Sequence, residues 1–209
     1  MLHLPPFEHV AAGSLTEAAT LLATHGDRAR LLAGGTDLLP RMKRRQDTPA
    51  LLVGLRGVAG LDECQAGPDG WILGAGVTVD VLAAGGPGAK GQSAALPRGL
   101  REAAASVATP TIRRMGTLGG NLCQETRCSF FDQGAFWRAA AGGCMKCQGT
   151  ICRVAPASDR CWAVAASDLA PALMALDATV SIVGPDGGRT GPLDQLYTGE
   201  GETPLALAV

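Results

Sequence analysis

The chain has 209 residues and a formal net charge of −1, and 46% of its residues are hydrophobic. A charge so close to zero gives no overall attraction to nucleic acid or to an anionic membrane surface. The N-terminal segment has no basic and apolar leader, and no run of about 18 apolar residues is available to span a bilayer. We therefore expect a cytoplasmic protein without a nucleic-acid or membrane partner.

Residues 1–56 predict a β-α-β arrangement. Segment 14–24 has the pattern of an amphipathic helix, with Ser14 as its N-cap and Glu17 completing a capping box. Segments 29–33 and 51–53 predict short strands, and segment 38–45 between them predicts a helix. A turn-rich stretch, 57–70, then marks a change in composition, so we expect one subdomain in residues 1–56 and a second in 57–209.

The second part of the chain mixes short strands and helices. Segment 71–77 predicts a strand, and segments 78–84 and 96–108 predict helices. Near the end, 169–176 predicts a short helix and 178–183 a strand that stops at a glycine-rich turn. The pattern as a whole predicts an α+β protein.

Two glycine-rich loops are candidates for binding a ligand. Gly34-Gly35-Thr36-Asp37 lies between a predicted strand and a predicted helix, where free N–H groups attract anions such as a pyrophosphate. The second loop is the segment GTLGGN, 116–121. Either loop alone is also compatible with an ordinary tight turn. Two of them in one small chain favour a bound dinucleotide.

Six of the seven cysteines lie between Cys123 and Cys161. Disulfides rarely persist in the cytoplasm, so crowded thiols there more often bind a metal or a cluster. The three histidines, His3, His9 and His25, are all far upstream. A metal site would therefore use cysteines alone, and the spacing leaves a zinc site, an iron–sulfur cluster and structural thiols all open.

Three segments in the same order resemble the FAD-binding subunit of molybdenum hydroxylases, the xanthine dehydrogenase family. They are LLAGGTDLLPRMKRR (31–45), TPTIRRMGTLGGN (109–121) and SDLAPALMAL (167–176). The resemblance implies the two-subdomain α+β FAD-binding fold of the PCMH type, without the C-terminal domain of that family. The FAD-binding residues that it implies are Leu31, Leu32, Ala33, Gly34, Gly35, Thr36, Asp37, Leu38, Val107, Thr117, Leu118, Gly119, Gly120, Asn121 and Asp168.

Within that family, the cysteine-rich part resembles the beta subunit of 4-hydroxybenzoyl-CoA reductase. The similar segments are LCQETRCSFFDQGAFWR and CWAVAASDLAPAL. That subunit holds an additional [4Fe–4S] cluster in an insertion after the second glycine loop, so the resemblance implies an inserted cluster loop at residues 123–163. The ligands that it implies are Cys128, Cys144, Cys152 and Cys161, with Cys147 as the main rival ligand.

The resemblance also implies a role in electron transfer. Ferredoxin would supply electrons through the [4Fe–4S] cluster and FAD to [2Fe–2S] clusters in a small subunit and a molybdenum cofactor in a large one. The chain shows no catalytic set of its own, so we expect the organic substrate to bind elsewhere. Two alternatives stay open: the FAD subunit of another molybdenum hydroxylase acting on xanthine, CO or aldehydes, and a zinc-stapled interaction module without enzymatic activity.

Overall fold

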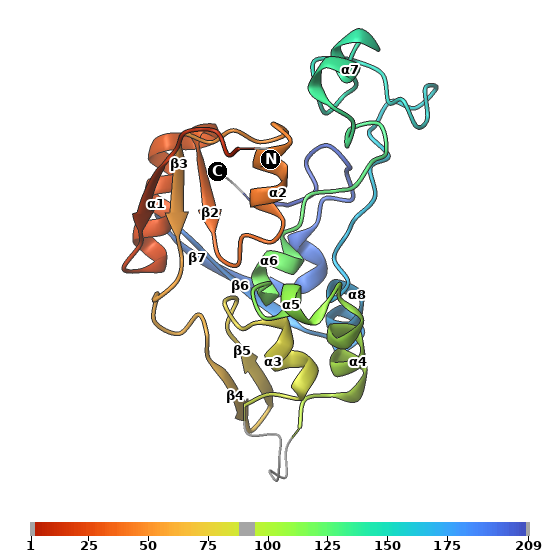
Figure 1. The fold of residues 1–209 in the computed structure, drawn as a ribbon. Coiled ribbons are helices and arrows are strands. Elements are labelled where there is room, and N and C mark those ends of the chain that lie inside the picture. Colours follow the sequence, from red (N-terminus) through yellow and green to blue (C-terminus); the bar gives the residue numbers. More distant parts are fainter. Residues whose placement is uncertain (1–2, 88–94, 208–209) are drawn as a thin grey trace.

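The computed structural model describes residues 3–87 and 95–207 (Figure 1). Residues 1–2, 88–94 and 208–209, which the expected subdomain ranges include, lie outside the described part. The first elements form a parallel sheet in the order β1-β3-β2, flanked by helices. These elements are β1 Glu8–Ala11, α1 Leu15–His25, the 3₁₀ helix η1 Gly26–Arg28, β2 Ala29–Leu32, α2 Leu38–Lys43 and β3 Leu51–Gly54.

Local sequence signals explain most of this sheet layer. Ser14 Oγ accepts the N–H of Glu17 at 3.1 Å, which confirms the predicted N-cap of α1. A capping box would have the Glu17 carboxylate accept the N–H of Ser14. It accepts instead the N–H of Gly13, one residue earlier, at 2.7 Å. β3 is buried along its whole length and pairs with a strand on either side, as a central parallel strand does. A small hydrophobic cluster that includes Ala18, Val53 and Val58 lies beneath it.

The rest of the chain surrounds a second, larger hydrophobic cluster. Leu82, Leu100, Leu118 and Leu169 meet in it from four different helices or their ends. Two antiparallel hairpins, β4-β5 and β6-β7, complete this part. Its elements are β4 Cys64–Gly67, β5 Gly70–Leu73, α3 Val79–Ala84, α4 Arg98–Ser106, α5 Pro110–Arg113, α6 Leu118–Leu122, α8 Ala170–Met174, β6 Thr179–Gly184, β7 Gly187–Pro192 and η2 Leu193–Leu196.

Two expectations for this part need correction. The strand predicted at 71–77 ends at Leu73, because Gly74 and Gly76 turn onto the main chain near Leu61; the N–H of Gly76 reaches the Leu61 carbonyl at 2.6 Å. The glycine-rich stretch after β6 is not only a turn. Residues 187–192 continue as β7 and pair with β6 in register, Thr179 opposite Pro192.

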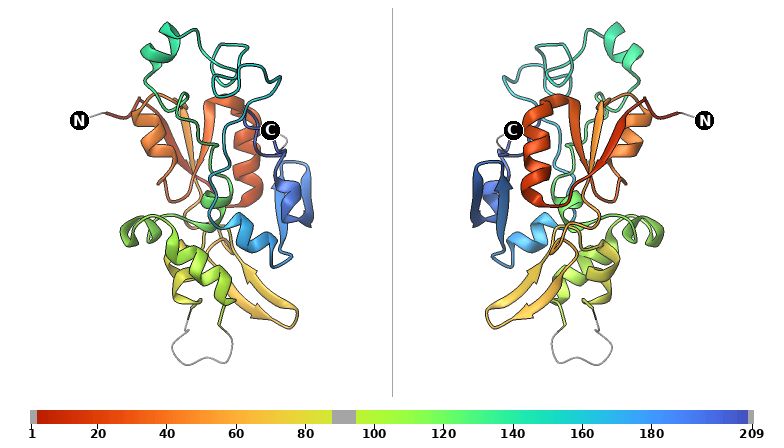
Figure 2. Two further views of the ribbon diagram at one scale, coloured as in Figure 1. Left: turned by 90° about the vertical axis from the view of Figure 1, so that its right-hand side faces the viewer. Right: turned by 90° about the vertical axis from the view of Figure 1, so that its left-hand side faces the viewer.

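Residues 123–163, which we call the cysteine loop, protrude from the rest of the molecule (Figures 1 and 2). α7, Ala135–Ala140, is the one named helix or strand within this loop, all of which the structure describes. The loop is closed at its neck by a pair of main-chain hydrogen bonds of 2.8 Å between Arg127 and Val164. This pair holds together the start of the loop, which follows α6, and its end, which leads toward α8.

No helix within residues 3–87 and 95–207 is long and apolar enough to cross a membrane.

Candidate functional site

The first glycine loop, residues 31–38, carries N–H groups that the chain itself leaves open. Gly34 packs so closely on another segment that a Cβ there would lie 1.8 Å from the Met115 carbonyl oxygen, and Gly35 has a φ of 69°. Within the described residues, no acceptor takes the N–H groups of Gly34, Gly35 or Thr36. The loop therefore fits an anionic ligand such as the pyrophosphate of FAD.

The second glycine loop, residues 116–121, has most of its polar groups engaged within the chain. The N–H groups of Leu118 and Gly119 each reach a carbonyl at 2.8 Å, and Thr117 Oγ1 accepts the Gly120 N–H at 3.1 Å. The buried Asn121 accepts hydrogen bonds from the Ser167 hydroxyl at 2.8 Å and the Leu169 N–H at 3.1 Å. Residues 118–121 are thus the first turn of α6, capped by Thr117, and not the irregular loop that we expected; Asn121 joins this helix to the segment before α8.

The two glycine loops lie against each other. A Cβ at Gly116 would lie 3.4 Å from Thr36 Oγ1, and Gly34 touches the main chain at Met115. Segments about 80 residues apart in the sequence thus form one surface, as a dinucleotide spanning both loops requires. Among the described residues, the first loop has three successive N–H groups without an acceptor, those of Gly34, Gly35 and Thr36, so its backbone is the part suited to phosphate.

The other residues predicted to contact FAD differ in burial. Leu31 is exposed, whereas Val107 is buried in the larger hydrophobic cluster, and its carbonyl accepts a hydrogen bond from Arg113 at 2.9 Å. Asp168 is exposed at the start of α8. The hydroxyl of Ser167, not Asp168, caps this helix by accepting the Ala170 N–H at 3.1 Å.

Asp37 belongs to an ionic network that sequence patterns did not reveal. Its carboxylate pairs with Arg127, which directly precedes Cys128, and lies 4.0 Å from Arg41 on α2. Arg41 also reaches Asp47 at 3.6 Å and Glu125 at 3.5 Å. The first glycine loop and α2 are therefore tied electrostatically to the start of the cysteine loop.

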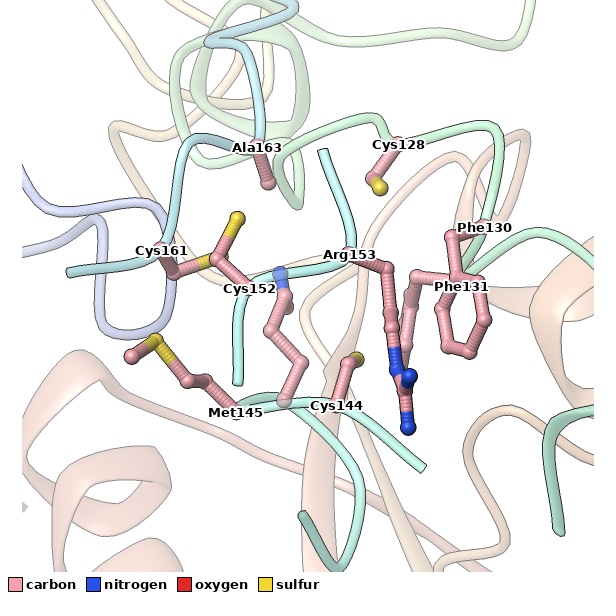
Figure 3. A pocket seen from close by; sticks show the side chains of 10 residues that line it. Cys128, Phe130, Phe131, Cys144, Met145, Cys152, Arg153, Cys161 and Ala163 are labelled. Carbon is pink, nitrogen blue, oxygen red and sulfur yellow. The ribbon is translucent and has the colours of Figure 1, made fainter. Parts of the chain in front are cut away.

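One pocket in the cysteine loop gathers the four predicted cysteine ligands (Figure 3). Cys147 is not among the residues that line it, which are Cys128, Phe130, Phe131, Cys144, Met145, Lys146, Cys152, Arg153, Cys161 and Ala163. All seven cysteines of the chain carry free thiols.

The cysteines are not arranged as a ready-made site for a single metal ion. Among the described residues, no three His, Cys, Asp or Glu side chains are grouped so that they could hold one ion. A structural zinc ion needs four ligands around one centre. In a four-iron cluster each thiolate binds a different iron, so the ligands stand further apart.

The surroundings of Cys152 favour its thiolate form. Burial acts to raise the pKa of this thiol, but the backbone N–H groups of Trp162, Ala155 and Val154 point at the sulfur and outweigh it, so the pKa is lowered. At Cys144 the balance is reversed. Burial is the largest effect there, the neighbouring Cys147 thiol adds to it, and the pKa is raised.

Cys144 and Cys147 lie on a tight turn. The two residues exchange main-chain hydrogen bonds of 3.0 and 2.7 Å, and the Gly149 N–H reaches the Cys144 carbonyl at 3.0 Å. Gly143 has a φ of 67°, and a Cβ on it would lie 2.3 Å from the Cys147 carbonyl oxygen. The sequence analysis did not predict this turn, although the Gly142-Gly143 pair just before Cys144 is a signal that indicates one.

Two arginines hold the cysteine loop by binding carbonyl groups. The buried Arg138 donates to the Phe131 carbonyl at 2.8 Å and to that of Gln133 at 2.5 Å. Arg153 donates to the Gly143 carbonyl at 2.9 Å and to a second carbonyl at the end of α7. Arg153 follows Cys152 directly, so it joins the Cys152 segment to the turn that carries Cys144.

The family of the chain follows from comparison with known proteins. Residues 5–208 match the model of the FAD binding domain in molybdopterin dehydrogenase. The chain therefore belongs to this family of FAD-binding domains, as the sequence resemblance predicted. The fold agrees: carbon monoxide dehydrogenase from Hydrogenophaga pseudoflava aligns over 99% of this chain and 56% of its own, with a TM-score of 0.68 and 26% identity.

Similar sequences are named as subunits of larger enzymes. The FAD-binding subunit PaoB of an aldehyde oxidoreductase from Escherichia coli is 34% identical over 193 residues, 89% of this chain and 59% of PaoB. The medium chain of carbon monoxide dehydrogenase from Afipia carboxidovorans is 38% identical over 115 residues, 55% of this chain and 38% of that protein. The chain thus spans less than two thirds of the length of the relatives that it matches.

Proposed function

We propose that this chain is an electron-transfer subunit that binds FAD and a [4Fe–4S] cluster within a molybdenum-containing oxidoreductase. The observation that carries this proposal is the pocket formed by Cys128, Cys144, Cys152 and Cys161 beside an FAD-binding domain. Four thiolates are the usual ligand set of a four-iron cluster, and N–H groups aimed at a ligand sulfur, as at Cys152, help to set its potential. When they are bound, FAD and the cluster are the groups that carry the electrons.

The residues have separate tasks in this proposal. The open N–H groups of Gly34, Gly35 and Thr36 bind the pyrophosphate of FAD, and the second glycine loop supports the first. The cysteine loop keeps the cluster pocket partly covered, with Phe131 forming part of its wall. Electrons would pass between the two cofactors without a covalent step on this chain.

We also propose the division into an N-terminal FAD-binding subdomain, 1–56, a second subdomain, 57–209, and a cluster loop, 123–163, inserted in the second. Two observations support it. The small hydrophobic cluster draws on residues 12–58 and the larger one on residues 77–196. The hydrogen bonds between Arg127 and Val164 give the inserted loop a defined neck.

For the complete enzyme, we propose a 4-hydroxybenzoyl-CoA reductase. Its support is the resemblance of the cysteine-rich segments and the agreement of the four implied ligands with the pocket. Reduced ferredoxin would donate electrons, which would pass through this chain to the [2Fe–2S] clusters of a small subunit and then to the molybdenum cofactor of a large subunit. In the large subunit the substrate would take up two electrons and two protons, and its phenolic hydroxyl would leave as water.

A second candidate is an aldehyde oxidoreductase, in which electrons would leave through this chain. The match to PaoB favours it, because the part of this chain outside that alignment is shorter than the cysteine loop. The alignment therefore includes at least part of the loop. The alignment with the medium chain of carbon monoxide dehydrogenase from Afipia carboxidovorans covers just over half of this chain and gives no such support.

Cofactor analysis of the anaerobically purified chain tests the proposal for the subunit. We expect bound FAD and about four irons per chain, the content of one cubane. Cys152→Ser should abolish iron binding and leave FAD in place, whereas Cys147→Ser should retain the iron. A protein that contains zinc and no iron would refute the cluster. Loss of iron in Cys147→Ser but not in Cys152→Ser would overturn the ligand assignment.

The assembled complex separates the two candidate enzymes. Reduced ferredoxin with 4-hydroxybenzoyl-CoA should yield benzoyl-CoA if the first candidate is right. Oxidation of an aromatic aldehyde with an artificial electron acceptor, and no reaction with the thioester, would favour the second. Cys152→Ser in the same complex should block ferredoxin-driven reduction while the FAD content stays unchanged.

A further inference from the structure

Lys146 is a buried cation in the wall of the cysteine pocket. It lies between Cys144 and Cys147 in the sequence, and its side chain is only 5% exposed. Its ammonium group donates to Glu125 Oε1 and Thr126 Oγ1 and lies 5.1 Å from the centre of the Phe131 ring. Burying a charged amine is costly unless it is paired, so these contacts stabilise the Lys146 ammonium group in its buried position.

Glu125 connects this cation to the FAD-binding part of the chain. One carboxylate oxygen accepts from Lys146, and the other lies 3.5 Å from Arg41 on α2, the helix that follows the first glycine loop. The pair of Asp37 and Arg127 makes a second, parallel connection next to Cys128. The cysteine pocket is thus held against the first glycine loop through ionic contacts.

We propose that Glu125 is a positioning residue that holds Lys146 in the pocket wall, where the Lys146 charge tunes the potential of the cluster. The inference rests on the proposed function, because it concerns the [4Fe–4S] site. A four-iron cluster with four thiolates is anionic, and net charge nearby is one determinant of its potential. A neighbouring cation favours the reduced, more negative form, and a neighbouring anion opposes it.

The two members of the pair should therefore shift the midpoint potential in opposite directions. Lys146→Met removes the cation and should lower it. Glu125→Gln keeps a hydrogen-bond acceptor but removes the anion, so it should raise the potential. We expect about a tenfold change in the ratio of reduced to oxidised cluster for each variant, which is about 59 mV for one electron. Lys146→Arg should restore the value of the parent chain.

The experiment is a redox titration of the cluster followed by EPR, with iron and FAD measured on every sample. Lys43→Met and Glu102→Gln are matched controls, because both residues are exposed and lie outside the cysteine loop. The controls should leave the potential unchanged. Shifts of the same sign in Lys146→Met and Glu125→Gln, or no shift in either, would overturn the inference.

Hydrogen exchange in the iron-free Cys152→Ser background tests the positioning role without the cluster. The amides of residues 144–149 should exchange faster when either Lys146→Met or Glu125→Ala is added, because each removes the hydrogen bond between these two side chains, and not when Lys43→Met or Glu102→Ala is added. Unchanged exchange in both would refute positioning. If the parent chain binds no iron, the proposed function fails at that step, and the exchange rates alone decide whether Glu125 positions the loop.

Discussion

The FAD-binding part, by which we mean the described residues outside 123–163, and the cysteine loop are stabilised in different ways. The first has two hydrophobic clusters, a parallel sheet and two hairpins. The loop has one short helix, and its aromatic and aliphatic side chains are largely exposed, including Phe136 at 89%. It is held instead by Arg138, Arg153 and Lys146, whose side chains bind carbonyl or carboxylate oxygens.

This contrast has a consequence for cofactor binding. A hydrophobic core stabilises its fold whether or not a ligand is bound, because burial of apolar area does not depend on the ligand. A loop held by a few polar contacts gains much more from ligands that join its segments, as metal ligation does in small domains. We therefore expect the FAD-binding part to fold without the cluster and the cysteine loop to become well ordered with it.

The largest effect should come from the core of the FAD-binding part. Leu52 is fully buried in the central strand β3, so Leu52→Ala should lower the free energy of unfolding by about 2–5 kcal/mol. Urea denaturation followed by circular dichroism measures it. The exposed Ile151 of the cysteine loop provides the control, and Ile151→Ala should change the same free energy little. If Leu52→Ala and Ile151→Ala lowered the free energy of unfolding equally, the hydrophobic core and the cysteine loop would not be stabilised in different ways.

A smaller effect, on FAD binding, should follow Gly34→Ala. The added Cβ would lie 1.8 Å from the Met115 carbonyl oxygen, so the first glycine loop must move away from the second. We expect FAD to bind at least about a hundredfold more weakly, or about 2.8 kcal/mol, measured by fluorescence titration. Gly99→Ala is the control because a Cβ there meets open space. Iron binding should persist in both variants, and its loss in Gly34→Ala would show that the two sites are less independent than we infer.

The sequence predicted elements whose signals are local. α1 has its cap residue and amphipathic pattern within a dozen residues, and β2 and β3 are short apolar runs beside turns. β1 and β7 were missed because their own sequences are poor strand formers. β1 is exposed along its length and depends on pairing with β3, and β7 is glycine-rich and depends on its hairpin with β6.

The candidate sites were predictable to different degrees for a related reason. The glycine loops and the cysteines stand out as residue types, and the family resemblance selected four cysteines that the structure brings to one pocket. The ionic network was not predictable. Glu125 is 84 residues from Arg41 and 21 from Lys146, and a sequence without its fold does not indicate which charges meet over such separations.

Arg138 offers a selective way to weaken the cysteine loop. Arg138→Met leaves the Gln133 carbonyl without its side-chain donor and leaves the Phe131 carbonyl with Gln46 Nε2 at 3.2 Å, at a cost of about 1–3 kcal/mol to the local structure. Hydrogen exchange should rise within residues 128–145, while the urea midpoint of the whole chain changes little. Arg160→Met is the control, since Arg160 is exposed and lies only over the Trp162 ring. A comparable drop in the urea midpoint for Arg138→Met and Leu52→Ala would show that the loop and the core unfold as one unit.

The smallest expected effect is a pH dependence of the junction between the two regions. Burial acts to raise the pKa of Glu125, but hydrogen bonding and charge from Lys146, together with Arg41, lower it below its ordinary value. A carboxylate with a depressed folded pKa stabilises the fold above its unfolded pKa, about 4.3, and this contribution is lost as pH falls through the folded pKa.

The experiment compares two chains in the iron-free Cys152→Ser background by urea denaturation. The chain with Glu125 should be more stable than Glu125→Gln at pH 7, and the difference should shrink as pH falls below about 4.3. Glu102→Gln should show little difference at any pH, because the exposed pair of Glu102 and Arg98 contributes little. A difference for Glu125→Gln that stays constant down to the acid transition would mean that the carboxylate charge does not hold the cysteine loop to α2.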